Sequence, residues 1–279
     1  MAIDTQRLRQ VVRGALDEDV GRGDVTTEAT VPASLQARGV LLAKEEIVLA
    51  GLDAAAMSFQ LIDPVLTWEP RVKDGDLLPP STVLAFVRGS ARSLLTAERV
   101  ALNFLQRLSG VATLTQKFVT AVAGTRVKIR DTRKTTPLLR FLEKRAVELG
   151  GGEAHRGGLD TALLVKDNHV RLAGSVGEAT RRALAAAGGL PVEIEVDRAD
   201  QIEDAIAAGA QMILLDNFTV EAVRAAVEQV NRRVPVEVSG GIKLETVRRY
   251  AEAGPDYIAV GALTHSAPAV DISLEIESD

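Results

Sequence analysis

Residues 212–241 read MILLDNFTVEAVRAAVEQVNRRVPVEVSGG. The apolar residues within 212–216 predict a short buried strand, and those within 236–239 predict a second one. Between them, apolar residues recur over 219–231 with the spacing of an amphipathic helix. A strand, a helix and a strand in this order are typical of parallel strands that a helix connects.

The same unit repeats through roughly residues 123–265. Strands are predicted at 127–130, 162–166, 192–196, 212–216, 236–239 and 257–260. Helices are predicted at 137–149, 175–187, 198–208, 219–231 and 243–253. Because strands and helices alternate, we expect an α/β fold whose parallel sheet forms a barrel or a near-barrel. No GxGxxG follows the first strand, which argues against a dinucleotide-binding fold.

The first 110 residues mix helices with short strands. The predicted elements are a helix over 5–18, a strand, turn and strand over 35–51, a helix near 53–62, and strands near 65–72 and 82–88. A long helical region is predicted over 92–122, and we expect Gly110 to break it.

The composition excludes several classes of protein. The 279 residues carry a formal net charge of −5, 3% of them are aromatic, and none is cysteine. The lack of cysteine excludes a disulfide scaffold, a cysteine-ligated metal site and a thiol nucleophile, and it suits a reducing cytoplasm. Few aromatics and an acidic balance argue against nucleic-acid binding. No apolar run is long enough to cross a membrane or to act as a signal peptide, so we expect a cytoplasmic protein.

One segment reverses the overall charge. Residues 126–145 contain eight basic residues against Asp131 and Glu143, which gives this segment a net charge of +6. A run of charges is usually a solvated helix face. Here, however, the basic residues begin inside a predicted strand, which favours a role in binding anions.

Polar residues or glycines lie at the end of every predicted strand in the repeating region. These positions are 130–134, 166–169, 195, 216–217, 239–241 and 261–262. In an α/β barrel the carboxyl ends of the strands carry the active site. The six positions therefore predict a site at this edge of the sheet. The alternative is a structural lattice of ion pairs in which Lys128 and Arg130 face Glu193 and Glu195.

The chemistry of these residues points to an anionic, phosphorylated substrate. Ser239-Gly240-Gly241 precedes a predicted helix, and Gly261-Ala262 follows the last strand, so both loops could bind phosphate through backbone N–H groups. Four cationic side chains could hold further anionic groups, and they belong to Arg133, Lys134, Arg156 and Lys166. His155 is a binding candidate because of its basic neighbours.

The two strand-end carboxylates leave several possibilities open. Glu195 and Asp216 could bind Mg²⁺ together with substrate phosphates, act as general acid and base, or form salt bridges with the lysines. Lys166 would also permit Schiff-base chemistry, as in barrel aldolases. These residues alone do not separate the two kinds of enzyme.

Motifs along nearly the whole chain resemble the quinolinate phosphoribosyltransferase family, the carboxylating nicotinate-nucleotide pyrophosphorylases. In order they are EDVGRGDVTT (18–27), NFL (103–105), LSG (108–110), DTRKTTP (131–137), GGGEAHR (150–156), KDNH (166–169), EIEV (193–196), LDNF (215–218), SGGI (239–242) and VGALTHS (260–266). The resemblance implies transfer of phosphoribosyl from phosphoribosyl pyrophosphate to quinolinate, with loss of CO₂ and pyrophosphate and Mg²⁺ as cofactor. The product would be nicotinate mononucleotide, a precursor of NAD.

The resemblance also implies roles for individual residues. Arg133, His155, Arg156 and Lys166 would bind the quinolinate carboxylates, while Lys134 and Lys166 would face the reacting centre. Glu195 and Asp216 would bind the ribose hydroxyls and the Mg²⁺-bearing substrate. The 5′-phosphate and the remaining substrate contacts would fall to Thr132, Ser239, Gly240, Gly241, Val260, Gly261 and Ala262. Arg99 matches an arginine that completes the neighbouring subunit's site, which implies a homodimer with shared sites and leaves a higher oligomer open.

The family's fold implies three segments. Residues 1–112 would form an N-terminal α/β sandwich, residues 113–267 an open, incomplete parallel α/β barrel, and residues 268–279 a tail that returns to the N-terminal domain. Two other functions stay open at this point: a related protein of the same fold linked to molybdenum transport, and a lysine-dependent barrel aldolase or phosphate-binding protein. The full set of cations around Arg133 and Arg156 favours a dicarboxylate substrate over the first of these.

Overall fold

The computed structural model describes residues 4–278, which divide into two compact units. Unit 1 comprises the chain up to Gln116, the segment Thr136–Gly151 and the chain from Ala267 onward. Unit 2 comprises Lys117–Thr135 and Gly152–Ser266. The predicted domain ranges are continuous, whereas these units alternate along the sequence. Within residues 4–278, no helix is both long and apolar enough to cross a membrane.

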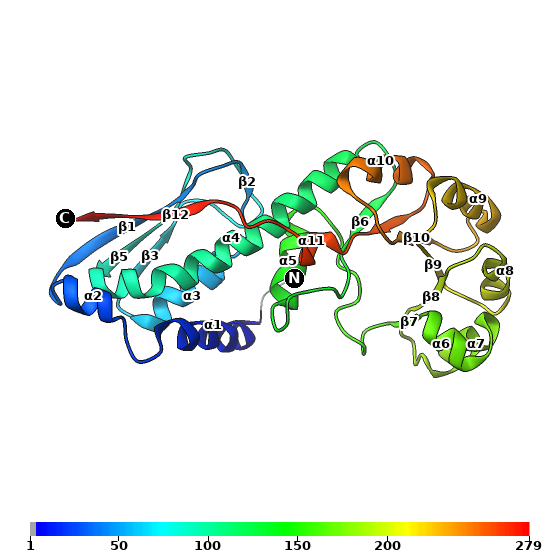
Figure 1. Ribbon diagram of the computed structural model, residues 1–279, viewed down its shortest axis with the longest axis horizontal. Coiled ribbons are helices and arrows are strands. Elements are labelled where there is room, and N and C mark those ends of the chain that lie inside the picture. The colour runs from blue at the N-terminus through cyan, green and yellow to red at the C-terminus, as the bar shows by residue number, and fades with distance from the viewer. Residues whose placement is uncertain (1–3, 279) are drawn as a thin grey trace. The chain divides into compact units, whose positions relative to one another are not determined.

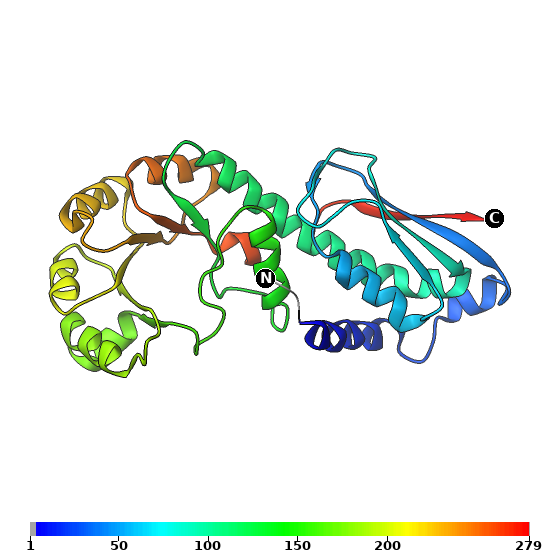
Figure 2. The same ribbon diagram turned by 180° about the vertical axis from the view of Figure 1, so that it is seen from behind.

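Unit 1 contains a four-stranded antiparallel sheet in the order β12-β1-β5-β3. Its strands are β1 (Gln36–Ala43), β3 (Thr67–Pro70), β5 (Val83–Ser90) and β12 (Ile272–Ser278), and β2 (Ile47–Val48) pairs with β4 (Leu77–Leu78). The helices are α1 (Thr5–Val20), α2 (Val25–Thr30), α3 (Leu52–Ile62), α4 (Ala91–Ala121) and α5 (Arg140–Leu149), and the last residues of α4 belong to unit 2. In Figures 1 and 2 the C-terminal strand β12 runs alongside β1.

The core of unit 1 lies between this sheet and the helices α3 and α4. Leu41 and Leu84 from the sheet, Phe59 from α3 and Leu94 from α4 are all almost inaccessible and belong to one apolar cluster. Strand β5 alternates buried and more exposed side chains from Ala85 to Arg88, as expected for a sheet with one face against helices. Unit 1 is therefore a sheet with helices packed on it, as the expected α/β sandwich requires.

The expected break in α4 at Gly110 is wrong, because the helix continues through it. A Cβ atom at Gly110 would collide with the backbone carbonyl of Pro268. The glycine therefore allows the chain before β12 to approach the helix closely. The neighbouring Ser109 donates from Oγ to the Ala50 carbonyl and accepts from the Ala50 N–H, which ties α4 to the chain after β2.

The segment Thr136–Gly151 carries α5 and belongs to unit 1, although the prediction placed it among the barrel helices. The Glu143 side chain is fully buried and accepts hydrogen bonds from Arg107 of α4 at 2.8 Å and from the Thr136 Oγ1 at 2.7 Å. A buried carboxylate needs such partners to offset its lost hydration. This ion pair anchors α5 to α4 within unit 1.

Unit 2 contains a six-stranded parallel sheet in the order β6-β11-β10-β9-β8-β7, within residues 117–266. The strands are β6 (Lys128–Arg130), β7 (Leu163–Val165), β8 (Val192–Val196), β9 (Met212–Asp216), β10 (Val236–Ser239) and β11 (Tyr257–Ala259). The helices are α6 (Asp167–Ala173), α7 (Val176–Ala186), α8 (Asp200–Ala207), α9 (Val220–Val230), α10 (Leu244–Glu252) and α11 (Ala262–His265). Figure 1 shows α7 to α10 on the outside of the curved sheet.

The edge strands β6 and β7 do not pair with each other, so the barrel is open, and the predicted fold class is confirmed. All six strands agree with the predicted ranges to within one residue at each end. In unit 2, the two short helices α6 and α11 are additional to the prediction. Both are too short, and lie too close to the strand ends, to show the apolar spacing from which a helix is predicted.

Candidate active site

A pocket of about 510 Å³ opens at the carboxyl ends of the strands of unit 2. This position agrees with the rule for α/β barrels. Its lining residues are Thr132, Arg133, Lys134, His155, Arg156, Leu164, Lys166, Glu195, Leu214, Asp216, Asn217, Glu237, Ser239, Gly240, Gly241 and Ala259. The lining therefore contains eleven of the fifteen residues predicted for the site.

The other four predicted residues lie elsewhere in the chain. Val260, Gly261 and Ala262 follow β11, and a Cβ atom at Gly261 would lie 3.2 Å from the Cδ of Lys134. The Thr264 Oγ1 donates to the Lys134 carbonyl at 2.8 Å, so the turn after β11 lies against the Lys134 segment. Arg99 lies on α4 in unit 1.

The cationic side chains of the pocket come from three segments. Arg133 follows β6, Arg156 lies before β7, and Lys166 caps the start of α6. The Nε atoms of Arg133 and Arg156 are buried and have no hydrogen-bond partner among the described residues. Burial, followed by the nearby charge of Arg133, lowers the pKa of Arg156, while Glu193 opposes this shift. Two buried donors without partners would be satisfied by an acidic ligand in this pocket.

Lys166 is engaged by a carboxylate. Its Nζ donates to the Glu195 Oε2 at 2.7 Å, and the Glu195 side chain is 9% exposed. Such a short contact is typical of a lysine–glutamate ion pair, and a carboxylate at this distance stabilises an ammonium group. Schiff-base formation needs the neutral amine, so this geometry does not favour the aldolase alternative.

The loop after β10 has the form of a phosphate cradle. Gly240 and Gly241 have φ angles of +99° and +62°, and α10 begins three residues later. A Cβ atom at Gly240 would lie 2.8 Å from the backbone N of Asn217, whose N–H donates to the Ser239 carbonyl. Only glycine allows the two strand ends to come this close. Backbone N–H groups without side chains around them are the usual donors to phosphate.

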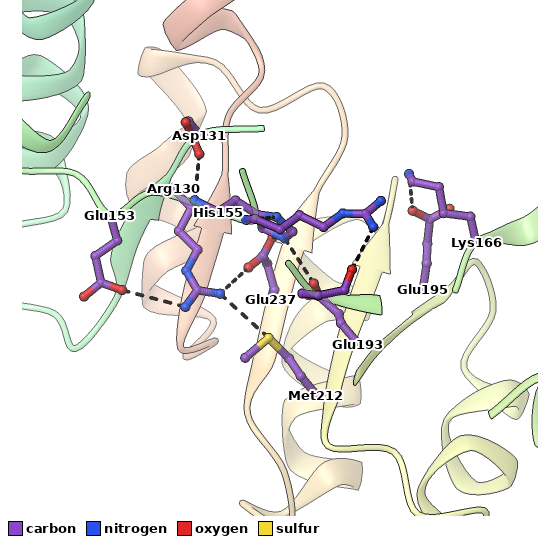
Figure 3. Close-up of polar contacts among 11 residues, drawn as sticks. Arg130, Asp131, Glu153, His155, Lys166, Glu193, Glu195, Met212 and Glu237 are labelled. Atoms are coloured by element: carbon purple, nitrogen blue, oxygen red, sulfur yellow. Dashed lines mark hydrogen bonds and ion pairs between the residues drawn. The ribbon is translucent and has the colours of Figure 1, made fainter. Parts of the chain in front are cut away.

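Prediction from the sequence missed a buried carboxylate at the base of the pocket. Glu237 has no exposed surface, and its Oε2 accepts from the Arg130 Nη1 at 2.8 Å (Figure 3). The Arg130 guanidinium also stacks 3.3 Å above the centre of the Tyr257 ring. Burial, together with the charge of Glu193, raises the pKa of Glu237 to about 7. The signal in the sequence was a glutamate between Val236 and Val238 in a strand covered on both faces.

The ion pairs of this region differ from the predicted lattice, because Arg130 pairs with Glu237 and Glu153. Lys128 pairs with Glu153 rather than with Glu193 or Glu195, because its side chain is mostly exposed. The Nδ1 of His169 accepts from the Lys166 N–H at 2.9 Å and so caps the start of α6. The ion pairs that do form coexist with the pocket and do not replace it.

His155 lies deep in the pocket wall, and Figure 3 shows it beside Glu193 and Glu237. Its Nε2 lies 3.0 Å from the Glu193 Oε2 and 3.5 Å from the Glu237 Oε1. Its Nδ1 accepts from the Arg156 N–H at 2.8 Å, and its own N–H donates to the Asp131 Oδ1 at 2.7 Å.

Glu195 and Asp216 have the donor chemistry for Mg²⁺. Both carboxylates end neighbouring parallel strands, β8 and β9, and both line the pocket. Lys166 engages one oxygen of Glu195, and Asn217 donates to the Asp216 Oδ2 at 2.7 Å. Each carboxylate has a second oxygen available for a cation that takes only one or two protein ligands.

Comparison with known proteins matches both units. The family model "Quinolinate phosphoribosyl transferase, N-terminal domain" matches residues 24–109, and the corresponding C-terminal domain model matches residues 111–275. The chain is 46% identical over 274 residues to the nicotinate-nucleotide pyrophosphorylase (carboxylating) of Mycobacterium leprae, covering 96% of each chain. It is 40% identical over 271 residues to the probable enzyme of that name from Bacillus subtilis, covering 97% of this chain and 93% of the relative.

Solved structures match over the full length as well. The nicotinate-nucleotide pyrophosphorylase of Francisella tularensis superposes with a TM-score of 0.95 at 36% identity, covering 99% of this chain and 98% of the other. The NadC protein of Streptococcus pyogenes gives 0.95 at 41% identity, covering 100% and 99%. The two domain models in tandem and these whole-length similarities show to which family the chain belongs. The chain belongs to the quinolinate phosphoribosyltransferase family.

Proposed function

We propose that this chain transfers the phosphoribosyl group of phosphoribosyl pyrophosphate to quinolinate and releases pyrophosphate and CO₂, giving nicotinate mononucleotide for NAD synthesis. The observation that carries the proposal is the composition of one pocket. It combines unpartnered arginine donors, a phosphate-type glycine loop and two strand-end carboxylates. Each of these features suits a different part of the two substrates.

The cations suit the dicarboxylate. Arg133 and Arg156 each offer a planar fork that can bind a carboxylate through two hydrogen bonds, and Lys166 adds a point charge. The apolar lining from Leu164, Leu214 and Ala259 suits the pyridine ring. The unsatisfied Nε donors of the two arginines favour binding of an anionic acceptor at this place.

Other residues of the pocket suit the phosphoribosyl group. The loop of Ser239, Gly240 and Gly241 would bind the 5′-phosphate, with the turn of Val260, Gly261 and Ala262 beside Lys134 and Thr132 completing the contacts. Glu195 and Asp216 would accept hydrogen bonds from the ribose hydroxyls. The same two carboxylates would hold Mg²⁺, which neutralises charge on the pyrophosphate when bound.

The residues of the pocket stabilise the charges that develop during the reaction, and no covalent intermediate with the protein forms. As pyrophosphate leaves, positive charge develops on the ribose ring, and Glu195 and Asp216 stabilise it. Lys134 stabilises the departing pyrophosphate. The quinolinate ring nitrogen bonds to the ribose C1 and becomes cationic. This positive charge stabilises the electron pair that the departing CO₂ leaves on the ring carbon, and a proton from water then takes the place of the 2-carboxylate.

A homodimer is part of the proposal. Arg99 would reach the pocket of a neighbouring subunit and supply another cation for the substrates. A cytoplasmic location, expected from the composition, also belongs to the proposal, and cell fractionation would test it.

One assay tests the function. The protein is incubated with quinolinate, phosphoribosyl pyrophosphate and Mg²⁺, and nicotinate mononucleotide and CO₂ are measured. We expect equal amounts of both products, and loss of turnover when a chelator removes the metal, with recovery on adding Mg²⁺. A control with nicotinate, which lacks the 2-carboxylate, should give far less product. Failure to form nicotinate mononucleotide from bound quinolinate would overturn the proposal.

A further inference from the structure

His155 differs from the arginines of the pocket in how its polar atoms are used. The Nε of Arg133 and of Arg156 find no partner among the described residues, so these side chains have donors available for a ligand. In His155, by contrast, both ring nitrogens are engaged by the protein. Nδ1 lies 2.8 Å from the Arg156 N, and Nε2 lies 3.0 Å from the Glu193 Oε2.

These contacts define the proton on the ring. A backbone N–H can only donate, so Nδ1 must accept from Arg156 and carries no proton. Glu193 is a carboxylate, so the Nε2–H donates to it. The ring then has no N–H left for a carboxylate of the substrate, which itself can only accept hydrogen bonds.

The surroundings of His155 hold it in this orientation. Its backbone N–H donates to Asp131, a fully buried carboxylate that follows β6. Two residues earlier, the Glu153 N–H donates to the Ile129 carbonyl at 2.8 Å. The segment before Arg156 has no helix or strand of its own, so these bonds and the ring fix its path.

We infer that His155 is a positioning residue which orients Arg156 toward the substrate, and that it does not itself bind the substrate carboxylate. The Nδ1 bond fixes the backbone of Arg156, and the Nε2 bond fixes the ring against β8. The Arg156 side chain is held further by donation from its Nη1 to the Ala162 carbonyl at 3.0 Å. This inference rests on the proposed function, because it assigns a role in binding quinolinate.

A double-mutant cycle separates positioning from direct contact. The variants are His155→Ala, Arg156→Ala and the double variant, with KM for quinolinate measured kinetically and Kd measured by calorimetry. If His155 acts through Arg156, then replacing His155 should have little effect on quinolinate binding in a protein that already lacks the Arg156 side chain. We expect each single substitution to raise both constants about 10- to 100-fold and the double variant to differ less than about threefold from Arg156→Ala. Constants in the double variant equal to the product of the two single effects would overturn the inference.

A conservative variant gives a second, independent readout. Glu193→Gln keeps an oxygen that accepts from Nε2, so we expect KM for quinolinate to stay within about threefold of wild type, while Glu193→Ala raises it as His155→Ala does. Loss of quinolinate binding in Glu193→Gln as large as in Glu193→Ala would contradict positioning through this hydrogen bond.

Controls keep the outcomes distinct. KM for phosphoribosyl pyrophosphate and the thermal unfolding midpoint should change little in every variant, which excludes general misfolding. Arg233→Ala, at an exposed ion pair with Glu203, serves as the matched arginine control and should match wild type. Wild-type protein that forms no product would overturn the proposed function itself. Wild-type activity combined with multiplicative effects would overturn the role of His155 alone.

Discussion

Glu237 shows how one residue can connect stability with the site. It is fully buried, it pairs with Arg130, and it lies 3.5 Å from the His155 ring. A carboxylate in this place is favourable only as long as its partners offset the lost hydration. Removing Arg130 alone would leave this charge buried without its main partner, which is more costly than exchanging the carboxylate for an amide.

We expect the stability of the protein to depend on the protonation of Glu237. Its pKa is about 7 in the folded protein, raised chiefly by burial from an ordinary value of 4.5. The folded state therefore holds a proton that the unfolded chain has released, and the free energy of unfolding falls as pH rises from about 4.5 to 7. The shift corresponds to a loss on the order of 3 kcal/mol. Thermal unfolding of wild type and Glu237→Gln from pH 5 to 8 should show a smaller decline in the variant; parallel curves would contradict this.

Gly240 makes a specific prediction for phosphate binding. Replacement by alanine strains a backbone at φ +99° and drives the Cβ against Asn217, so the loop must move. We expect KM for phosphoribosyl pyrophosphate to rise at least about tenfold in Gly240→Ala. A Cβ at Gly241 meets no atom within 4 Å, so Gly241→Ala should have the smaller effect. Equal kinetics of Gly240→Ala and wild type would refute the close approach.

At the level of elements, helix α4 contains Gly110 at a position where helix propensity alone would favour alanine. Alanine is the better helix former, and an exposed glycine inside a helix normally costs about 0.5–1 kcal/mol. Gly110 is instead covered by Pro268, where the chain leads into β12. Tertiary contact therefore overrides helix propensity at this position.

Two glycine substitutions test this override. Gly110→Ala should lower the free energy of unfolding by about 1–3 kcal/mol, because the new methyl group collides with the Pro268 backbone. Gly14→Ala, in the interior of α1, meets no atom within 4 Å and should instead raise it by about 0.4–1 kcal/mol. Chemical denaturation measures both, and a stabilised Gly110→Ala variant would show that the contact is unimportant.

The sequence was sufficient for the elements with strong periodicity. The strands of unit 2 and the helices α7 to α10 follow from apolar spacing, and the strand ends locate the pocket. Spacing could not show that α5 belongs to unit 1, because Glu143 is buried by a distant partner, Arg107. Spacing also could not show which basic residues of 126–145 line the pocket and which bind other parts of the chain. Arg133 and Lys134 line the pocket, whereas Arg126 binds the backbone before β11.

At the scale of the whole molecule, our proposal is that a second subunit completes the site. The pocket holds its own cations from unit 2, and Arg99 lies in unit 1 of the same chain. If Arg99 serves a neighbouring pocket, then activity lost through one subunit can be restored by another. This is a property of the assembly and not of a single chain.

Mixed dimers test that property. Arg99→Ala and Lys134→Ala should each be inactive, since each loss removes a charge-assisted contact worth about 2–4 kcal/mol in the transition state. After the two proteins are mixed and their subunits exchange, a hybrid dimer contains one pocket with both residues intact. We expect partial recovery of activity, up to about a quarter of wild type if subunits mix randomly. No recovery despite demonstrated exchange would show that the sites are not shared.

The pairing of β12 with β1 has a consequence for synthesis of the protein. Translation releases β1 long before β12, because β1 ends at Ala43 and β12 begins only at Ile272. Until β12 has been made, the nascent chain therefore has β1 with one edge unpaired. An unpaired strand edge is a template for association with other chains. Unit 1 can complete its sheet only after β12 has emerged from the ribosome, so a ribosome that stalls before β12 would leave a chain whose unit 1 is prone to aggregate.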